Sequence, residues 1–279
     1  MKVEQFVDLL KKNRGYLDWG TERLSNRFNV PHDVVIAVKR LIKSEGFGRN
    51  GKNRSKDESP SKVNSKVNTL FIVDLHLPFE HSKALNFCLY LQDKWNCERI
   101  IFLGDIIDNH FPSFHNISTK AKGGEEELEL ARQAIKGWYK AFPNAYICSG
   151  NHCSLSTRVA EANNLPQSWI KSINEVLEVP NWKISTKWEF DNFVAIHGTD
   201  GKSIKNKLFK YGGNKSIVQG HFHTSTSLEY YNENLWGMQL GALIDKNAYA
   251  FEYANNNSQT VILSAGVLVN GVPIIETLK

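Results

Sequence analysis

The hydrophobic pattern of this sequence contains five short, mainly apolar runs, each followed directly by polar residues. The runs cover residues 70–73, 100–103, 145–148, 193–196 and 216–219. Short apolar runs rich in β-branched and aromatic residues predict strands that are buried on both faces. The carboxyl ends of parallel strands share one edge of a sheet, where open α/β sheets bind their ligands. We therefore expect the residues that follow the five runs to lie close together.

Helical periodicity fills the intervals between the first three runs. Residues 82–93 place apolar side chains on one helix face, and residues 125–141 form an acidic amphipathic pattern. A strand, a helix and a second strand in succession form a right-handed crossover between parallel strands. Residues 154–180 have a helical pattern interrupted at Pro166, and the sequence from Trp182 onward is rich in strand patterns. This order predicts an α/β fold.

The amino-terminal part, residues 1–47, instead predicts three short helices. They cover residues 3–12, a segment that begins near Thr21, and a segment that begins at Pro31 and ends before Gly46. Three short helices with a tight turn before the third resemble a helix-turn-helix, in which the third helix approaches nucleic acid. On that interpretation the nucleic-acid contacts come from basic residues of the third helix: Lys39, Arg40 and Lys43. A protein-interaction or dimerisation module is the alternative.

The net charge of +5 is unevenly distributed along the chain. Residues 1–68 contain 15 Lys and Arg against 8 Asp and Glu, whereas the remainder contains 19 against 21. Within the basic part, residues 48–66 have almost no apolar side chains and predict a flexible linker to a second domain, residues 67–279. A basic module on a basic linker favours a polyanionic partner such as nucleic acid. A solvated surface without a partner is the alternative.

No segment has the composition of a membrane span or of a disulfide framework. The apolar runs are far shorter than the roughly 20 residues that a span needs. Lys11 and Lys12 interrupt the apolar sequence after Met1, so no secretory segment is predicted. The four cysteines form no CxxC pair, which fits a reducing compartment. We expect a cytoplasmic protein without a membrane partner, and the sequence leaves its oligomeric state open.

The polar residues after the apolar runs are of the types that hold divalent metals. They are Asp74, His76, Asp105, Asn151, His197, His221 and His223. Carboxylates, imidazoles and an amide oxygen suit Mn, Fe, Zn, Co or Ni, with Mn the first expectation, and no thiolate is involved. Seven ligands are too many for one ion. We therefore expect two metals that share a carboxylate, the arrangement that serves phosphoryl chemistry.

The order of these motifs resembles that of the calcineurin-like metallophosphoesterase superfamily, over residues 67–275. The motifs D-x-H, GD-x-x-D, GNH, H-G and GH-x-H occur as Asp74-Leu75-His76, Gly104–Asp108, Gly150-Asn151-His152, His197-Gly198 and Gly220–His223. The resemblance implies an α/β two-sheet sandwich flanked by helices, beside the small all-α trihelical domain. It also implies two ligand sets bridged by Asp105: Asp74, His76, Asp105 and His223 for one metal, and Asp105, Asn151, His197 and His221 for the other. Phage-encoded members are similar, which would place the protein in a host cytoplasm.

Two further residues are assigned to catalysis beside the metals. His152 adjoins a ligand and is expected to protonate or stabilise the leaving oxygen. Asp108 is expected to orient a ligand histidine, with capping of the following turn as the alternative. The family has Asp or Glu directly after the histidine of its GNH motif, whereas this chain has Cys153. We therefore expect another group to orient His152.

The residue after Asp108 bears on the choice of substrate. Protein phosphatases of the superfamily have an arginine there, which holds a phosphomonoester dianion, and this chain has Asn109. We therefore expect a phosphodiesterase or nuclease that acts on nucleic acid or nucleotides through a hydroxide bridging two metals. One alternative is a phosphomonoesterase whose missing cation comes from substrate-binding residues, namely His110, His115 or Arg158. The other is a DNA-binding regulator with an inactive phosphoesterase domain.

Overall fold

The computed structural model describes residues 3–12, 20–44, 67–109, 111, 122–190, 192–248 and 260–279. The chain divides into two compact units, one of Met1–Lys66 with Leu89–Asn96 and one of Val67–Cys88 with Cys97–Lys279. Within the described ranges, no helix is both long enough and apolar enough to cross a membrane. All five strands predicted from the apolar runs belong to the second unit.

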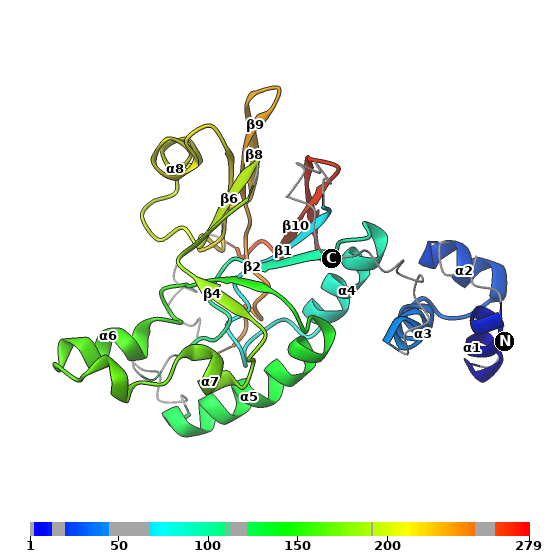
Figure 1. Cartoon of the computed structure of the whole chain (residues 1–279), viewed down its shortest axis with the longest axis horizontal. Coiled ribbons are helices and arrows are strands. Elements are labelled where there is room, and N and C mark those ends of the chain that lie inside the picture. The colour runs from blue at the N-terminus through cyan, green and yellow to red at the C-terminus, as the bar shows by residue number, and fades with distance from the viewer. Residues whose placement is uncertain are drawn as a thin grey trace, which may run out of the picture. The chain divides into compact units, whose positions relative to one another are not determined.

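The described residues before Val67 form three helices (Figure 1). They are α1 (Val3–Lys12), α2 (Thr21–Phe28) and α3 (His32–Ser44). Their apolar faces enclose a small core that includes Phe6, Leu10, Leu24 and Val35. After α2 the chain turns at Asn29, whose φ of 48° lies in the left-handed region that asparagine tolerates. The predicted small trihelical domain is confirmed, and its helix-turn-helix function stays a prediction.

The first sheet of the second unit has six strands in the order β11-β10-β1-β2-β3-β4. Its strands are β1 (Thr69–Ile72), β2 (Arg99–Phe102), β3 (Tyr146–Cys148), β4 (Lys183–Ser185), β10 (Ser264–Val269) and β11 (Val272–Thr277). β1, β2, β3 and β4 are parallel to one another, whereas β10 runs antiparallel to both β1 and β11. Ile72 pairs with Phe102, so the chain leaves β1 and β2 at the same edge.

The second sheet has five strands in the order β5-β6-β7-β9-β8. They are β5 (Lys187–Glu189), β6 (Phe193–Ile196), β7 (Ser216–Gln219), β8 (Ser227–Asn232) and β9 (Leu235–Gln239). β6, β7 and β9 are parallel, and Ile196 pairs with Gln219. β6 and β7 therefore also end at the same edge of their sheet.

The core of the second unit lies between the two sheets. Phe71 and Ile101 of the first sheet share one buried cluster with Phe193, Val218 and Met238 of the second. The rings of Phe71 and Phe193 meet edge to face, with centroids 5.4 Å apart. This arrangement confirms the predicted two-sheet sandwich.

Helices flank the sandwich, as predicted (Figure 1). They are α4 (Ala84–Lys94), α5 (Gly124–Ala141), α6 (Leu155–Ala162), the short η2 (Gln167–Trp169), α7 (Ile173–Leu177), α8 (Ile204–Lys207) and the π-helical turn η3 (Leu208–Gly212). Trp138 of α5 packs on Phe102 of β2, with ring centroids 6.0 Å apart. Leu208 joins a cluster with Val194 and Ile217, which covers the outer face of the second sheet.

Candidate metal centre

The polar segments that follow the five strands meet at one place, and backbone groups join them. His76 N donates to the carbonyl oxygen of Asp105 at 2.9 Å, which links the segments after β1 and β2. His152 N donates to Asp105 Oδ1 at 2.9 Å, and His221 N donates to Asp74 Oδ2 at 2.7 Å. These bonds tie segments from both sheets to two buried carboxylates. The residues that follow the five predicted strands therefore form a single site.

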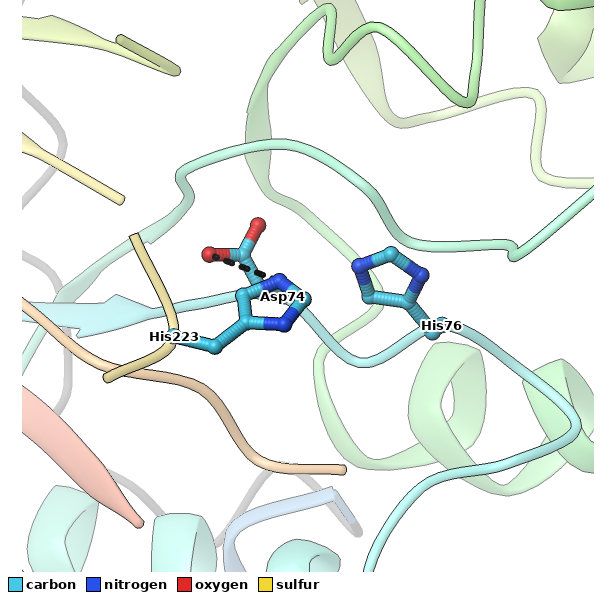
Figure 2. Close-up of side chains that lie close together, drawn as sticks. All are labelled: Asp74, His76 and His223. Carbon is cyan, nitrogen blue, oxygen red and sulfur yellow. Dashed lines mark ion pairs between the residues drawn. The ribbon is translucent and has the colours of Figure 1, made fainter. Parts of the chain in front are cut away.

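Asp74, His76 and His223 form the first group of candidate ligands, and their ligand atoms lie within 4.8 Å of one another (Figure 2). His223 Nε2 lies 4.0 Å from Asp74 Oδ2, the pair marked by the dashed line. His76 Nδ1 lies 2.7 Å from Asp108 Oδ1 and donates to it, which leaves Nε2 as the nitrogen available to a metal. Asp74 Oδ1 is buried and accepts no hydrogen bond from the described residues. A buried carboxylate oxygen of this kind fits a cation.

Asp105, Asn151, His197 and His221 form the second group. His197 Nδ1 donates to the carbonyl oxygen of Leu103 at 2.8 Å, so Nε2 is the nitrogen that faces the group. Around Nε2 lie three further acceptor atoms: Asn151 Oδ1 at 2.9 Å, Asp105 Oδ2 at 3.0 Å and His221 Nδ1 at 3.2 Å. Acceptor atoms that converge in this way need a positive charge among them, from a proton or a metal cation. The donor set therefore fits a divalent metal.

Asp105 belongs to the surroundings of both groups. Its Oδ2 atom, 3.0 Å from His197 Nε2, also lies 3.8 Å from His76 Nε2 of the first group. Its Oδ1 atom is occupied by the backbone of His152. The oxygen between the two groups is thus the one left for a cation on either side.

The protein groups shift one another's pKa values in a pattern that favours positive charge in the second group. Burial raises the pKa of Asp74 to about 8. Burial alone would raise the pKa of Asp105 too, but the neighbouring His197 outweighs it and holds that pKa below its usual range. Burial opposes protonation of His197, yet Asp105 and Asp74 raise its pKa to about 9. Burial lowers the pKa of His76 to about 3 and that of His221 to about 4. Most of the imidazoles are therefore neutral, the form that binds metals.

The backbone at the site is strained. Asp74, His76, Asp105 and His221 have φ angles of 38°, 47°, 39° and 73°, a left-handed region in which each such residue costs about 1–3 kcal/mol. Gly104 has a φ of 111°, and a Cβ atom there would lie 2.4 Å from His197 Nδ1. Only glycine allows the His197 ring to lie against this turn. Strain of this kind is concentrated at functional sites.

A family model of calcineurin-like phosphoesterases matches residues 67–261, the segment that carries all seven candidate ligands. The chain belongs to this family. Membership confirms the resemblance seen in the motif order and the predicted enzyme class, a metal-dependent phosphoesterase. No match was found among curated proteins.

Solved structures that resemble this calcineurin-like phosphoesterase do so at low identity. An archaeal phosphodiesterase is 16% identical, with 76% of this chain and 100% of that chain covered and a TM-score of 0.43. Yfce, a phosphoesterase from E. coli, is 12% identical, with 73% and 89% covered and a TM-score of 0.40. Vacuolar protein sorting 29 from Cryptosporidium parvum is 13% identical, with 76% and 96% covered and a TM-score of 0.38. These similarities concern the fold alone.

Asp108 and His152 lie directly beside the first group of this phosphoesterase. Asp108 Oδ1 accepts from His76 Nδ1 and lies 3.5 Å from His152 Nδ1. His152 Nδ1 donates to the backbone oxygen of Asp108 at 2.6 Å. A main-chain carbonyl thus orients the imidazole where the family uses an acidic side chain. The Cys153 thiol does not orient His152, because it is hydrogen-bonded to the backbone of Ile106, Ile107 and Gly150. Burial raises the pKa of this thiol to about 11.

The remaining residues predicted from sequence lie elsewhere. Lys39 is buried with Nζ 3.7 Å from Asp93 Oδ1, and Arg40 donates to Gln92 Oε1 at 3.0 Å, both within the amino-terminal unit. Arg158 is an exposed residue of α6. The side chain of Lys43 and the residues His110 and His115 lie outside the described part of the chain. The nucleic-acid and substrate roles given to all six stay predictions.

Sequence reasoning missed two supports of the site. Gln239 Nε2 donates to the carbonyl oxygen of Gly220 at 2.9 Å, and Gln239 Oε1 accepts from Gln219 Nε2 at 2.7 Å. Lys207 is buried, and its Nζ donates to the carbonyl oxygen of Gly198 at 2.9 Å and to Asp200. Both supports hold turns that carry candidate ligands. Gln219 is the polar end of a buried run in the sequence, whereas Lys207 belongs to a basic stretch, residues 202–210, whose pattern fits either a cover over the site or a solvated helix face.

Proposed function

We propose that this protein is a binuclear metal-dependent phosphodiesterase that acts on nucleic acid or nucleotides. The observation that carries the proposal is the position of Asp105 Oδ2, 3.0 Å from His197 Nε2 and 3.8 Å from His76 Nε2. One carboxylate oxygen between two groups of ligands suits two cations that share it. The first cation would be held by Asp74, His76, Asp105 and His223, and the second by Asp105, Asn151, His197 and His221.

The chain's own side chains divide the remaining work. When bound, the two cations would supply Lewis acidity and make hydroxide available from water at neutral pH. His152 Nδ1 is committed to the backbone oxygen of Asp108, so Nε2 is the atom that holds a proton for the leaving oxygen. The Asp108 carboxylate lies 3.5 Å from His152 Nδ1, and it fixes His76 in the tautomer that binds metal through Nε2.

Asn109 supports a diester rather than a monoester as the substrate. A phosphomonoester dianion needs an additional cation, which the corresponding arginine supplies in the protein phosphatases of the superfamily. Asn109 is neutral, and its Nδ2 donates to the carbonyl oxygen of His152 and to Ser156 Oγ, both at 3.1 Å. It therefore holds the backbone of the catalytic histidine. A diester carries a single negative charge and has less need of such a clamp.

The basic amino-terminal segment supports a nucleic-acid or nucleotide substrate. Residues 1–68 contain 15 Lys and Arg against 8 Asp and Glu, and they precede the phosphoesterase domain directly. A basic module joined by a linker raises the local concentration of a polyanionic substrate near the active site. Binding through that module should weaken steeply as salt concentration rises.

The test is Mn²⁺-dependent hydrolysis of bis-p-nitrophenyl phosphate beside p-nitrophenyl phosphate, with the wild type, Asp105→Asn and Glu98→Gln. Glu98 is an exposed carboxylate next to the opposite end of β2, so its variant is the matched control. We expect faster diester turnover that Asp105→Asn abolishes and Glu98→Gln preserves. Faster monoester turnover would make the protein a phosphatase. No turnover with any divalent metal would favour the inactive regulator.

A further inference from the structure

A cavity of about 330 Å³ lies beside the candidate metal centre and has no part in the chemistry described above. Most of its lining residues come from the segment after β2 and from α5, α6 and α7, and the others come from the segments after β1 and β3 and before α7. α5 and α7 pack against each other, and Arg132 Nε of α5 donates to the carbonyl oxygen of Val176 at 2.8 Å (Figure 1). The walls are therefore held by helices of the phosphoesterase domain itself.

Three lining residues of the cavity adjoin residues of the site along the chain. Leu77, Asn109 and Cys153 line it, and each directly follows a residue of the site in sequence: His76, Asp108 and His152. Asn109 also donates to the carbonyl oxygen of His152 and to Ser156, another lining residue. A phosphate ester held at the metals would thus have one of its substituents beside the cavity.

The walls combine apolar side chains with a few polar ones. Ile107, Leu128 and Val176 are among the apolar lining residues. The polar ones are Ser156 and Thr157, which contribute hydroxyl groups, and the charged Glu127 and Lys171. Small-molecule sites have this composition, and their volumes begin at about 300 Å³. The cavity has the size for one ring system with part of a sugar and is too small for a folded polymer.

An exposed aromatic ring stands in the same wall. Phe111 lines the cavity, and 54% of its surface is exposed although it is a large apolar side chain. Its ring lies against Gly124, where an added Cβ atom would approach it to 2.8 Å. An aromatic side chain that is anchored on one side and open on the other is a stacking surface for a planar ring.

We propose that this cavity binds the base of a nucleotide whose phosphate lies at the metal centre. The inference rests on the proposed function and deepens it, because it makes a single nucleotide the unit that the site recognises. The ring would stack on Phe111, and the hydroxyl groups of Ser156 and Thr157 would face polar atoms at its edge. Stacking of one base strengthens binding by about 5- to 100-fold.

The test compares ligands that differ only in the base. Calorimetry with the full-length Mn²⁺-loaded protein would measure the affinity of ribose 5-phosphate and of the four common nucleoside 5′-monophosphates. We expect at least one nucleotide to bind about 5- to 100-fold more tightly than ribose 5-phosphate. Equal affinities for all five ligands, or no binding of any of them, would overturn the inference.

Two cavity variants and their controls test whether the preference for a nucleotide arises in this cavity. Thr157→Phe fills the cavity from α6 and should remove the preference for the nucleotide while leaving ribose 5-phosphate binding unchanged. Glu161→Phe, at an exposed position of the same helix outside the cavity, should preserve the preference. Phe111→Ala should reduce the preference, whereas Phe209→Ala, at a phenylalanine that is 70% exposed and does not line the cavity, should not. If neither Thr157→Phe nor Phe111→Ala alters the preference, the base binds elsewhere and the inference fails.

Measurements of binding and of turnover distinguish a failure of the proposed base site from a failure of the proposed phosphodiesterase activity. A protein that prefers nucleotides but hydrolyses no diester would contradict the proposed phosphodiesterase activity and leave the base site standing. A protein that hydrolyses diesters without any preference for a base would contradict the base site alone. Should Thr157→Phe fail to fold, Val176→Phe fills the same cavity from α7 and gives the same comparison.

Discussion

The two groups that meet at Asp105 differ in how closely their ligand atoms approach one another. In the second group, three acceptor atoms lie 2.9–3.2 Å from His197 Nε2. In the first, His223 Nε2 lies 4.0 Å from Asp74, and His76 Nε2 lies 3.8 Å from Asp105. A group whose ligands already converge loses less conformational freedom when it binds a cation. We therefore expect the second group to bind its cation more tightly.

The cause of this difference lies in the supports of each group. His197 is held by the carbonyl oxygen of Leu103, and the turns after β6 and β7 are joined by a hydrogen bond from Gly220 N to the carbonyl oxygen of His197 at 2.9 Å. In the first group, the imidazole of His76 is instead held by the side chain of Asp108. Main-chain partners move less than side chains do. The tighter geometry thus follows from the strands themselves.

The largest effect is expected from Asp105→Asn, which disturbs both groups at once. The amide retains the shape of the carboxylate but loses the charge that two cations would share. We expect kcat for the diester to fall by about 10³-fold or more, because metal activation contributes several kcal/mol. Inductively coupled plasma analysis of purified protein should find fewer than two ions per chain. Unchanged turnover and metal content in this variant would contradict the assignment of Asp105 as a ligand shared by two cations.

Gly104→Ala should damage mainly the second group. The new Cβ atom would meet His197 Nδ1, at a φ of 111° that alanine rarely adopts. Displacement of a catalytic group by about 1 Å costs on the order of 10²-fold in rate, and the tighter Mn²⁺ binding step should weaken. Gly123→Ala is the matched control, since no atom of the described residues beyond its chain neighbours lies within 4 Å of a Cβ there. Equal metal affinity in the two variants would contradict the assignment.

Asp108→Asn should weaken the first group alone. Loss of the carboxylate that holds His76 Nδ1 is expected to cost about 10- to 100-fold in metal affinity. Calorimetric titration with Mn²⁺ should show the change in the weaker binding step. His152→Asn, by contrast, should lower kcat and leave both steps unchanged. A matching loss of Mn²⁺ affinity in His152→Asn would make that residue a ligand instead of an acid.

Gln239→Leu should have the smallest effect on activity. It removes the donor to Gly220 and the acceptor of Gln219 while leaving every candidate ligand in place. An unpaired buried amide costs about 1–3 kcal/mol, so Tm should fall by about 2–10 °C, with kcat changed less than tenfold. The double variant with Gln219→Leu should recover part of the lost stability, which differential scanning fluorimetry would measure.

The sequence predicts the strands and the candidate ligands but not the contacts that support them. Apolar runs indicate strands because burial on both faces leaves no polar position in the run. The sequence alone therefore predicts β1, β2, β3, β6 and β7. The seven candidate ligands follow those runs directly, and the structure brings them together. Contacts between residues distant in sequence carry no such signal. Nothing in the sequence indicates that a main-chain oxygen orients His152, or that Lys207 turns inward to Gly198.

The cavity beside the centre illustrates the same limit. Most of its walls come from helices and loops that are separated in sequence, so no single stretch of the sequence indicates it. Asn109 was identified from sequence by what it lacks, a positive charge. Its bonds to the carbonyl oxygen of His152 and to Ser156 emerge only from the packing of α6 beside the segment after β2.

The most direct test of two cations bridged by Asp105 is electron paramagnetic resonance during titration with Mn²⁺. Two manganese ions that share a ligand are magnetically coupled, and we predict a coupled signal that reaches its maximum at two ions per chain. Asp105→Asn should abolish that signal, whereas Glu98→Gln should preserve it. Saturation at one ion, or at two uncoupled ions, would contradict the account.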